Sequence, residues 1–203
     1  MTRNQIVRQS YLKLSIAALA IITGCATAQQ SAPAPPAGPE VTTVYLVRHA
    51  EKSTMVPTDP DPDITSAGKR RADDLATRLG AAGVTAIIAT QFKRTQETAQ
   101  PLATQLGIAP EIILAGTKDH PDSVAAAVLR HRGGKILVVG HSNTLPGIIA
   151  ALGGPRLPNL CDAEYSNLFV MYIPASGRVE LTRQHYGARD PAPDQACQEM
   201  QAH

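Results

Sequence analysis

The sequence predicts an α/β fold: a three-layer sandwich with a mainly parallel central sheet, helices on both faces, and one or more antiparallel edge strands near the C-terminus. Three observations support it. From residue 41 onward, short apolar runs alternate with segments of helical spacing. The run KILVV (135–139) is apolar after its first residue, as is typical of parallel strands covered on both faces. Near the C-terminus, two β-like runs are separated only by a short turn, which indicates a hairpin.

The elements can be placed in chain order from their spacing and from turn residues. Strands are expected at residues 41–47, 84–89, 111–114, 135–139, 166–173 and 178–183. Helices are expected at residues 65–79, around 94–99, at 122–129 and at 148–152. Thr65 is the predicted N-cap of the first helix and Asn143 that of the last, because both side chains can accept hydrogen bonds from backbone N–H groups.

The N-terminus resembles a bacterial lipoprotein signal. Basic residues precede the apolar run LSIAALAII (14–22), which is about half as long as a membrane-spanning helix must be. Cys25 follows small residues just after that run, so we expect a lipidated Cys25 once the signal peptide, residues 1–24, is removed. The alternative is an ordinary secretory signal that is cleaved near residues 26–28.

A lipidated cysteine would anchor the protein in the cell envelope. By resemblance to Gram-negative lipoproteins, Ala26 favours the periplasmic face of the outer membrane; without the anchor the protein would be periplasmic or secreted. Residues 25–40 are rich in Ala and Pro and form an expected semi-rigid linker of about 3 Å per residue. The folded domain is then expected at 41–187 and a C-terminal tail at 188–203.

The two other cysteines, Cys161 and Cys197, would lie in an oxidising compartment and could pair there. Such a disulfide would tie the C-terminal tail back to the domain, and the alternative is two unrelated thiols. The sequence has no C-x-x-C and no zinc-like spacing, so neither a metal nor another cofactor is expected.

Charge and composition argue against nucleic acid as a partner. Without the three basic residues of the signal peptide, 16 basic residues (19 minus 3) stand against 17 acidic ones, which leaves no cationic footprint. Aromatic residues make up only 3% of the chain, so stacking on bases or cofactors is not expected to dominate. Contact with a membrane is expected through the lipid anchor only, and the sequence does not define an oligomeric state.

Polar residues follow three of the expected strands where each strand ends. Arg48 and His49 follow the first strand, Arg94 closes TQFKR (90–94) after the second, and His141 follows the run at 135–139. Because ligands of open α/β sheets bind beyond the carboxyl ends of the strands, we expect these side chains to converge on an anion, with phosphate the obvious candidate. A neutral histidine among arginines, which lower its pKa, can attack phosphorus.

Four segments resemble the histidine phosphatase superfamily, in its phosphoglycerate mutase-like branch, over residues 41 to about 187. They are Arg48-His49-Ala50-Glu51, with Ala in place of the usual Gly, DITSAG (63–68), RTQETA (94–99) and VVGHSN (138–143). The resemblance implies that His49 is the nucleophile. It also implies that Arg48, Arg94 and His141 bind phosphate and stabilise the transition state.

The proton donor is less well defined. Members of this branch often use a Glu between the second arginine and the second histidine, where this chain has Glu97, Glu111, Asp119 and Asp122. Glu97 belongs to the RTQETA helix and is expected to serve structure. Asp119, in the loop GTKDH (116–120), and Glu51, two residues from His49, are the candidates. Compact members without an obvious donor favour good leaving groups such as phosphohistidine.

The expected function is therefore that of a metal-independent phosphatase, acting on a phosphorylated small molecule or a phosphoprotein through a phosphohistidine on His49. One alternative is a catalytically weak binding module for a phosphate ligand or a protein, because a clear acid is missing. A mutase is the weaker alternative, because the domain lacks the insertions of phosphoglycerate mutases and an exported protein would not meet the glycolytic pool.

Overall fold

The computed structural model describes residues 41–192, 194 and 197. The predicted signal peptide, the lipidation site at Cys25 and the linker at 25–40 lie outside the described residues. Within the described part of the chain, no helix combines the length and the apolar character that crossing a bilayer would require.

The described residues form six strands and four helices that alternate along most of the chain. The strands are β1 (Thr42–Arg48), β2 (Ala86–Ala89), β3 (Glu111–Ile112), β4 (Lys135–Gly140), β5 (Asn167–Ile173) and β6 (Glu180–His185). The helices are α1 (Ser66–Leu79), α2 (Lys93–Leu106), α3 (His120–Arg130) and α4 (Leu145–Ala151).

The strands form one mixed sheet in the order β3-β2-β4-β1-β5-β6. β1 is parallel to β4 and antiparallel to β5, and β5 in turn pairs antiparallel with β6. β2 pairs parallel with both β3 and β4. The predicted fold class, a mainly parallel sheet with antiparallel strands contributed by the C-terminal part, is confirmed.

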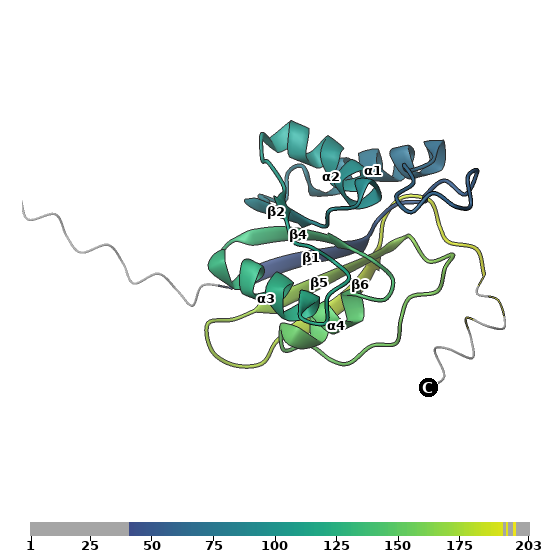
Figure 1. The fold of residues 1–203 in the computed structure, drawn as a ribbon. Coiled ribbons are helices and arrows are strands. Elements are labelled where there is room, and N and C mark those ends of the chain that lie inside the picture. The colour runs from purple at the N-terminus through teal and green to yellow at the C-terminus, as the bar shows by residue number, and fades with distance from the viewer. Residues whose placement is uncertain (1–40, 193, 195–196, 198–203) are drawn as a thin grey trace, which may run out of the picture. The chain divides into compact units, whose positions relative to one another are not determined.

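Helices cover both faces of the sheet, with α1 and α2 on one face and α3 and α4 on the other (Figure 1). On the first face Leu75 and Leu102 pack against Val139, and each of them is almost fully buried. On the second face Val128 and Ile148 lie in one cluster with strand residues. Burying a side chain of this size contributes roughly 1.5–3 kcal/mol, so the two cores fix the sheet between its helices.

The ends of two helices differ from the sequence prediction. The N-cap of α4 is Thr144, so the prediction of Asn143 was wrong. The helix begins at Leu145, before the apolar run at 148–152 from which it was predicted. This start is favoured because Leu145 is buried and Pro146 falls in the first turn, where proline needs no hydrogen-bonded N–H. α2 is longer than expected and continues through Pro101 to Leu106. Thr65 caps α1 as predicted, because its side chain accepts from the backbone N–H of Gly68 at 3.0 Å.

Candidate active site

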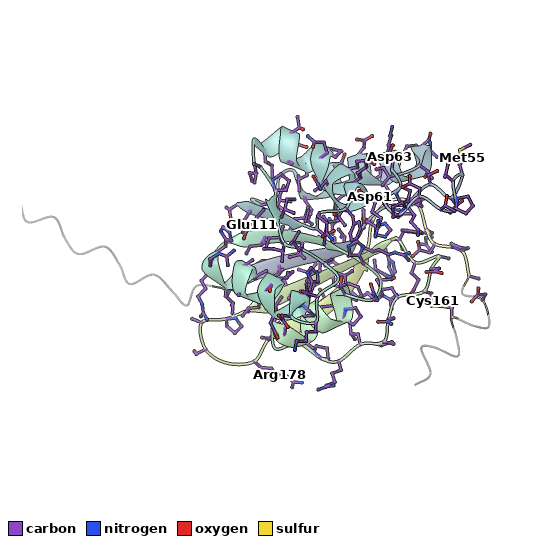
Figure 2. The ribbon with its side chains drawn as sticks, viewed as in Figure 1. Met55, Asp61, Asp63, Glu111, Cys161 and Arg178 are labelled. Carbon is purple, nitrogen blue, oxygen red and sulfur yellow. A yellow bond between two sulfur atoms is a disulfide. The ribbon has the colours of Figure 1, made fainter. Side chains whose placement is uncertain are left out.

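The carboxyl ends of β1, β2 and β4 meet at one edge of the sheet. Arg48, the last residue of β1, pairs in register with Gly140 of β4, and the backbone N–H of His49 donates to the Gly140 carbonyl at 2.9 Å. Figure 2 shows Asp61 and Cys161 toward this edge and Glu111, where β3 begins, toward the opposite one. His49 and His141, the residues that directly follow β1 and β4, are therefore neighbours.

A cavity of about 530 Å³ opens at this edge. All four side chains predicted to bind phosphate line it: Arg48, His49, Arg94 and His141. Its other lining residues are Lys52, Thr54, Phe92, Ala115, Gly116, Ser142, Asn143, Thr144, Asp162 and Tyr165. Three cationic side chains and one carboxylate make the cavity suited to an anion.

The backbone carbonyl of the next residue, Ala50, orients His49. Its Nδ1 lies 2.8 Å from the carbonyl oxygen of Ala50, and because a carbonyl can only accept, Nδ1 carries the proton. In the neutral ring, Nε2 then holds the lone pair. The His141 ring centroid lies 5.4 Å from that of His49. The arrangement presents a basic nitrogen in a buried site, since only 4% of His49 is exposed.

Burial also keeps both histidines neutral. Burial, with the charges of Arg48, His141 and Arg94, lowers the pKa of His49 to about 3, although the hydrogen bond to Ala50 opposes the shift. Burial, with Arg94, His120 and Arg48 nearby, lowers the pKa of His141 to about 4. Near pH 7 both rings are neutral, which a nucleophilic histidine requires.

A chain of hydroxyl groups holds His141. Its Nε2 lies 3.1 Å from Oγ1 of Thr90, which lies 2.9 Å from Oγ1 of Thr95. The Thr95 hydroxyl donates to the carbonyl of Phe92 at 2.8 Å, so the Thr90 hydroxyl donates to Thr95 and accepts from His141 Nε2. Thr90 follows β2 directly, which ties the second histidine to the end of that strand.

The RTQETA segment, at the start of α2, holds the loop that follows β1. Thr98 Oγ1 accepts from the backbone N–H of Ala50 at 2.8 Å and donates to the Arg94 carbonyl at 2.6 Å. Glu97 accepts from the backbone N–H of Ile64 at 2.7 Å, which agrees with the structural role expected for it. The helix thus joins the loop after β1 to Arg94.

Arg94 has its own supports. Its guanidinium lies 4.2 Å from the centre of the Phe92 ring, and its Nη1 lies 3.6 Å from a carboxylate oxygen of Asp61. Asp61 Oδ1 also accepts from the backbone N–H of Lys93 at 3.0 Å. These contacts bring the loop before α1 against the start of α2 and hold Arg94 at the cavity.

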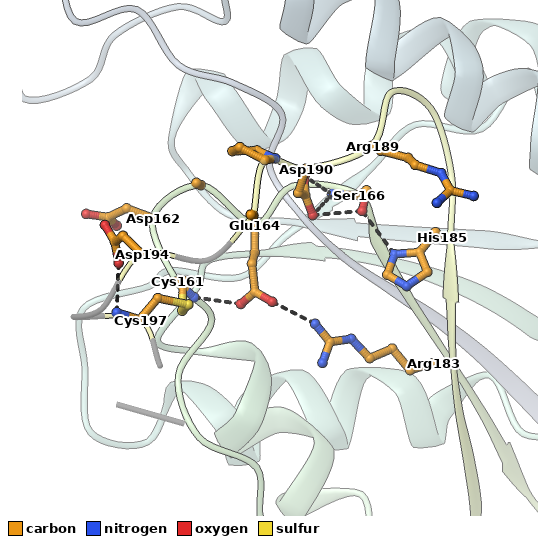
Figure 3. A pocket seen from close by; sticks show the side chains of 13 residues that line it. Cys161, Asp162, Glu164, Ser166, Arg183, His185, Arg189, Asp190, Asp194 and Cys197 are labelled. Atoms are coloured by element: carbon orange, nitrogen blue, oxygen red, sulfur yellow. Dashed lines mark hydrogen bonds and ion pairs between the residues drawn. A yellow bond between two sulfur atoms is a disulfide. The ribbon is translucent and has the colours of Figure 1, made fainter. Parts of the chain in front are cut away.

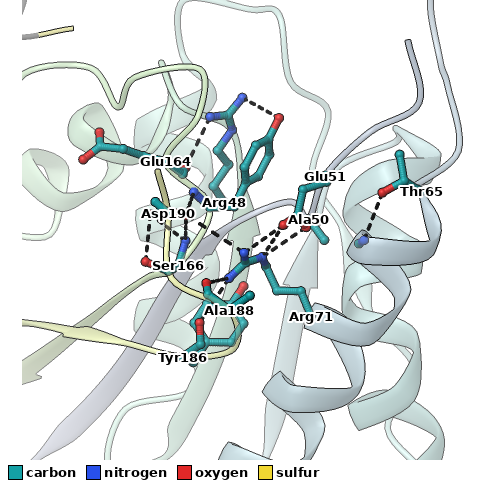
Figure 4. Close-up of polar contacts among 12 residues, drawn as sticks. Arg48, Ala50, Glu51, Thr65, Arg71, Glu164, Ser166, Tyr186, Ala188 and Asp190 are labelled. Carbon is teal, nitrogen blue, oxygen red and sulfur yellow. Dashed lines mark hydrogen bonds and ion pairs between the residues drawn. The ribbon is translucent and has the colours of Figure 1, made fainter. Parts of the chain in front are cut away.

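Glu51, a predicted proton-donor candidate, points away from the cavity and binds Arg71 (Figure 4). Arg71 Nε donates to its two carboxylate oxygens at 3.0 and 3.1 Å, and Nη2 donates at 2.8 Å. Arg71 is 4% exposed, and its Nη1 donates to the carbonyls of Tyr186 and Ala188. The pair therefore joins α1, the end of β1 and the chain after β6.

Position 68, in the first turn of α1, has no room for a side chain. A Cβ at Gly68 would lie 2.6 Å from the carbonyl oxygen of Glu51 and 2.9 Å from Cβ of Ile64. Helix α1 can approach the loop after β1 this closely only because position 68 is glycine. The DITSAG segment is thus a packing motif beside the loop that follows β1.

The second predicted donor, Asp119, is the N-cap of α3 and is exposed. Neither Asp119 nor Glu51, both described by the structure, lines the cavity, and their assignment as donors remains a prediction. The carboxylate that does line it is Asp162, with Oδ1 3.9 Å from Arg48 Nη2. It follows Cys161 in an irregular loop, so no strand or helix pattern could have identified it.

Sequence reasoning also missed Tyr165. The Arg48 guanidinium lies 4.2 Å from the centre of its ring, and the ring centroid of Tyr165 is 6.2 Å from that of His49. Burial raises the pKa of Tyr165, so its hydroxyl keeps its proton. Tyr165 precedes β5, which lies beside β1, and the topology of the sheet brings it to the cavity.

The structure joins Cys161 to Cys197 by a disulfide, with the two Cα atoms 5.4 Å apart. The bond borders a second cavity of about 670 Å³ beneath the C-terminal residues (Figure 3), which shares Asp162 with the first. Glu164 lies with the two sulfur atoms in the one described group that has the spacing of a metal site. Sulfur atoms bonded to each other are not thiolate ligands.

In this α/β fold, one cavity brings together Arg48, His49 and His141 at the ends of β1 and β4 and Arg94 at the start of α2. A family model described as the histidine phosphatase superfamily (branch 1) matches residues 44–115. Three of the four sequence segments lie in that range, so the predicted resemblance is confirmed there, whereas VVGHSN (138–143) lies beyond it.

Curated relatives are similar to part of the chain. A probable phosphoglycerate mutase GpmB from Yersinia enterocolitica is 36% identical over 69 residues, which are 32% of this chain and 32% of that protein. The chain therefore spans about a third of the length of this curated relative, and it covers 9% of a PE-PGRS family protein from Mycobacterium tuberculosis.

Two solved structures share the fold. A putative phosphohistidine phosphatase SixA from Nakamurella multipartitia has a TM-score of 0.52 at 23% identity, covering 76% of this chain and all of that one. A mycobacterial glucosyl-3-phosphoglycerate phosphatase, Rv2419c, has a TM-score of 0.55 at 15% identity, covering 72% of this chain and all of the other. At these identities the likeness shows the fold alone.

Proposed function

We propose that the chain is a metal-independent phosphatase that hydrolyses a phosphomonoester or a phosphoprotein through a phosphohistidine on His49. The observation that carries the proposal is the orientation of His49. Its Nδ1 is committed to the Ala50 carbonyl, so the basic Nε2 shares one cavity with Arg48, Arg94 and His141. A nucleophile and the charges that neutralise a phosphoryl group are both supplied by side chains.

The reaction proceeds in two steps. Nε2 attacks phosphorus in line with the ester oxygen, an N–P bond forms, and the O–P bond breaks with its electron pair on the leaving group. Arg48 and Arg94 offset the charge on the other phosphoryl oxygens. Water then attacks phosphorus, its oxygen enters the phosphate, and the N–P bond electrons return to Nε2.

The leaving group needs a proton only if it is a poor one. The described residues that line the cavity include one carboxylate, Asp162, and its side chain is fully exposed. A carboxylate that is fully open to water is not held against a leaving group bound in the cavity, so we expect Asp162 to be a weak acid catalyst. The cavity therefore favours substrates with good leaving groups, such as a phosphohistidine or an aryl phosphate.

The names of the similar proteins are consistent with a phosphorylated substrate, since they include a phosphohistidine phosphatase and a sugar-phosphoglycerate phosphatase. A mutase is the second candidate, because a relative that matches 32% of this chain is named a probable phosphoglycerate mutase. Phosphate release from 3-phosphoglycerate, against its conversion to 2-phosphoglycerate, separates the two reactions.

The experiment that tests the proposal is hydrolysis of p-nitrophenyl phosphate by the purified protein beside His49→Ala, with and without EDTA. We expect EDTA-resistant hydrolysis that disappears in the variant, and a phosphorylated wild-type protein after rapid quenching at alkaline pH, where phosphohistidine survives. Equal activity of both proteins would overturn the nucleophile. Phosphate binding without turnover by the wild type would favour the alternative, a phosphate-binding module.

We also propose that the protein is anchored to the envelope by lipid on Cys25 and faces the periplasm. The signal-like N-terminus supports this proposal, and the disulfide is consistent with an oxidising compartment. Mass spectrometry of the N-terminal peptide from membranes tests it: diacylglycerol on Cys25 is expected, and a free N-terminus near residue 27 would contradict it.

A further inference from the structure

Arg48 is held by the backbone of one loop. Its Nη1 donates to the carbonyl oxygens of Cys161 at 2.8 Å and Asp162 at 2.9 Å, and the Glu164 carbonyl lies at 3.3 Å. Arg48 is only 3% exposed, and a buried guanidinium needs partners for its N–H groups. The ion pair with Asp162 is long, at 3.9 Å, and that carboxylate is exposed, so it contributes little. The loop carbonyls therefore determine where Arg48 points.

Because the loop binds Nη1, the nitrogen atoms of the guanidinium have different surroundings. Nη1 faces the loop, whereas Nη2 makes only a long contact with the Tyr165 hydroxyl at 3.4 Å, and Nε has no hydrogen-bond partner among the described residues. Nε and Nη2 form one edge of the planar group, and such an edge bonds two phosphate oxygens in parallel. The orientation of Arg48 thus decides which edge faces the cavity.

The loop that orients Arg48 has no regular secondary structure. The backbone N–H of Cys161 donates to Glu164 Oε2 at 2.8 Å, and that of Leu160 donates to the Ser142 carbonyl at 3.1 Å. Its covalent constraint is the bond from Cys161 to Cys197, and both cysteines are buried. The disulfide is therefore attached to the residue whose carbonyl lies closest to Nη1.

We propose that the Cys161–Cys197 disulfide is a positioning element of the phosphate site, which fixes the loop carbonyls and through them the orientation of Arg48. This inference rests on the proposed function of the cavity. Without the bond, residues 161–164 sample more conformations, and a bound anion must first order them. A loss equal to one charge-assisted hydrogen bond would weaken phosphate binding about tenfold.

A disulfide that only stabilised the fold would not act through Arg48. The two roles separate in a double-mutant cycle, because an effect transmitted by Arg48 must disappear when Arg48 is changed. Arg48→Lys keeps the positive charge but lacks the planar fork that the loop carbonyls hold. Leu79→Ala, in a buried position at the end of α1, lowers stability without touching the loop and serves as the matched control.

The test is calorimetric titration of inorganic phosphate into five full-length proteins under conditions where all are folded: wild type, Cys161→Ser/Cys197→Ser, Arg48→Lys, the triple variant and Leu79→Ala. We expect the paired serine substitution to weaken phosphate binding about tenfold in the wild type and less than about twofold in Arg48→Lys. Leu79→Ala should bind phosphate like the wild type. If the paired variant does not fold, Cys197→Ser alone replaces it with the same expected loss.

Two outcomes would overturn the inference alone: unchanged phosphate affinity after serine substitution, or an equal loss with and without Arg48. A third outcome has a different meaning. If the wild-type protein binds no phosphate, the proposed phosphate site itself is wrong, and the inference falls with it.

Discussion

Replacing Glu51 by glutamine separates the two roles that this residue could have. The structure places its carboxylate on the buried Arg71, with three N–H contacts between 2.8 and 3.1 Å, and outside the cavity. Glutamine keeps one acceptor oxygen, loses the negative charge, and turns an NH2 group toward Arg71. We therefore expect a loss of stability and little change in turnover.

The expected loss of stability depends on which hydrogen bonds Arg71 retains in the variant. Breaking a buried ion pair by removing one partner costs about 3–5 kcal/mol. The Glu51 side chain is 24% exposed, and Arg71 still donates to the carbonyls of Tyr186 and Ala188, so we expect about 2–3 kcal/mol for Glu51→Gln. A proton donor would behave differently, with kcat falling by roughly 10²–10⁴ at nearly unchanged stability.

The assay combines urea unfolding, followed by circular dichroism, with kcat for p-nitrophenyl phosphate at a temperature where both proteins are folded. Glu180→Gln makes the same chemical change at an exposed strand position and should alter the free energy of unfolding by less than about 0.5 kcal/mol. A 100-fold loss of kcat in Glu51→Gln with an unchanged unfolding midpoint would show that Glu51 is the donor and that our reading of the Arg71 pair is wrong.

Four further predictions follow from the structure. Because the pKa of His49 is lowered to about 3, kcat/KM corrected for substrate ionisation should stay level from pH 8 to about pH 5; a fall centred near pH 6.5 would contradict this. Both buried histidines bind protons less readily than in the unfolded chain, so the free energy of unfolding should decrease as pH falls from about 6.5 toward 4, as urea titrations at each pH would measure. Gly68→Ala should destabilise the protein by about 1–3 kcal/mol and lower kcat, because its Cβ meets the Glu51 carbonyl; Ala67→Gly in the same turn should leave kcat unchanged. Removing the disulfide, whose cysteines lie 36 residues apart, should lower the unfolding free energy by about 4 kcal/mol, and an unchanged melting temperature would show that the unfolded chain is not constrained by it.

The convergence of the four site residues could be predicted because it depends on regular structure. Arg48 ends an apolar strand, His49 and His141 directly follow apolar strands, and the carboxyl ends of parallel strands share one edge. Arg94 follows the third such strand after a short turn and begins a helix whose spacing is visible in the sequence. Topology alone was enough to bring these residues to one cavity.

The direction of Glu51 could not be predicted in the same way. Beyond the end of β1 the side chains no longer alternate between two faces, so distance along the chain does not say where the carboxylate points. Its partner, Arg71, lies on α1 in a basic run that looks like a solvated helix face. Burial of Arg71 depends on the chain after β6, which covers it from 115 residues away.

Tyr165 and the carbonyls around Arg48 were missed for a related reason. They belong to an irregular loop whose position depends on a disulfide and on the neighbouring strand β5. Neither hydrophobic period nor turn chemistry gives a signal for backbone carbonyls that bind a side chain. Asp162 lies in the same loop, and only the folded chain shows that it borders the cavity.

The place of β1 in the sheet has a consequence for how the protein acquires activity. The strand is the first in the domain, yet it lies between β4 and β5, so its partners begin at residues 135 and 167. Contacts this distant in sequence form slowly, because long loops must close before the pairing repays their entropy. A chain emerging from a ribosome or a translocation channel would therefore carry His49 long before it could present it, and proteolysis or chaperone binding would compete for an unpaired, apolar β1. His49 is therefore synthesised early and reaches its place in the cavity late, after the residues of β4 and β5 have been made.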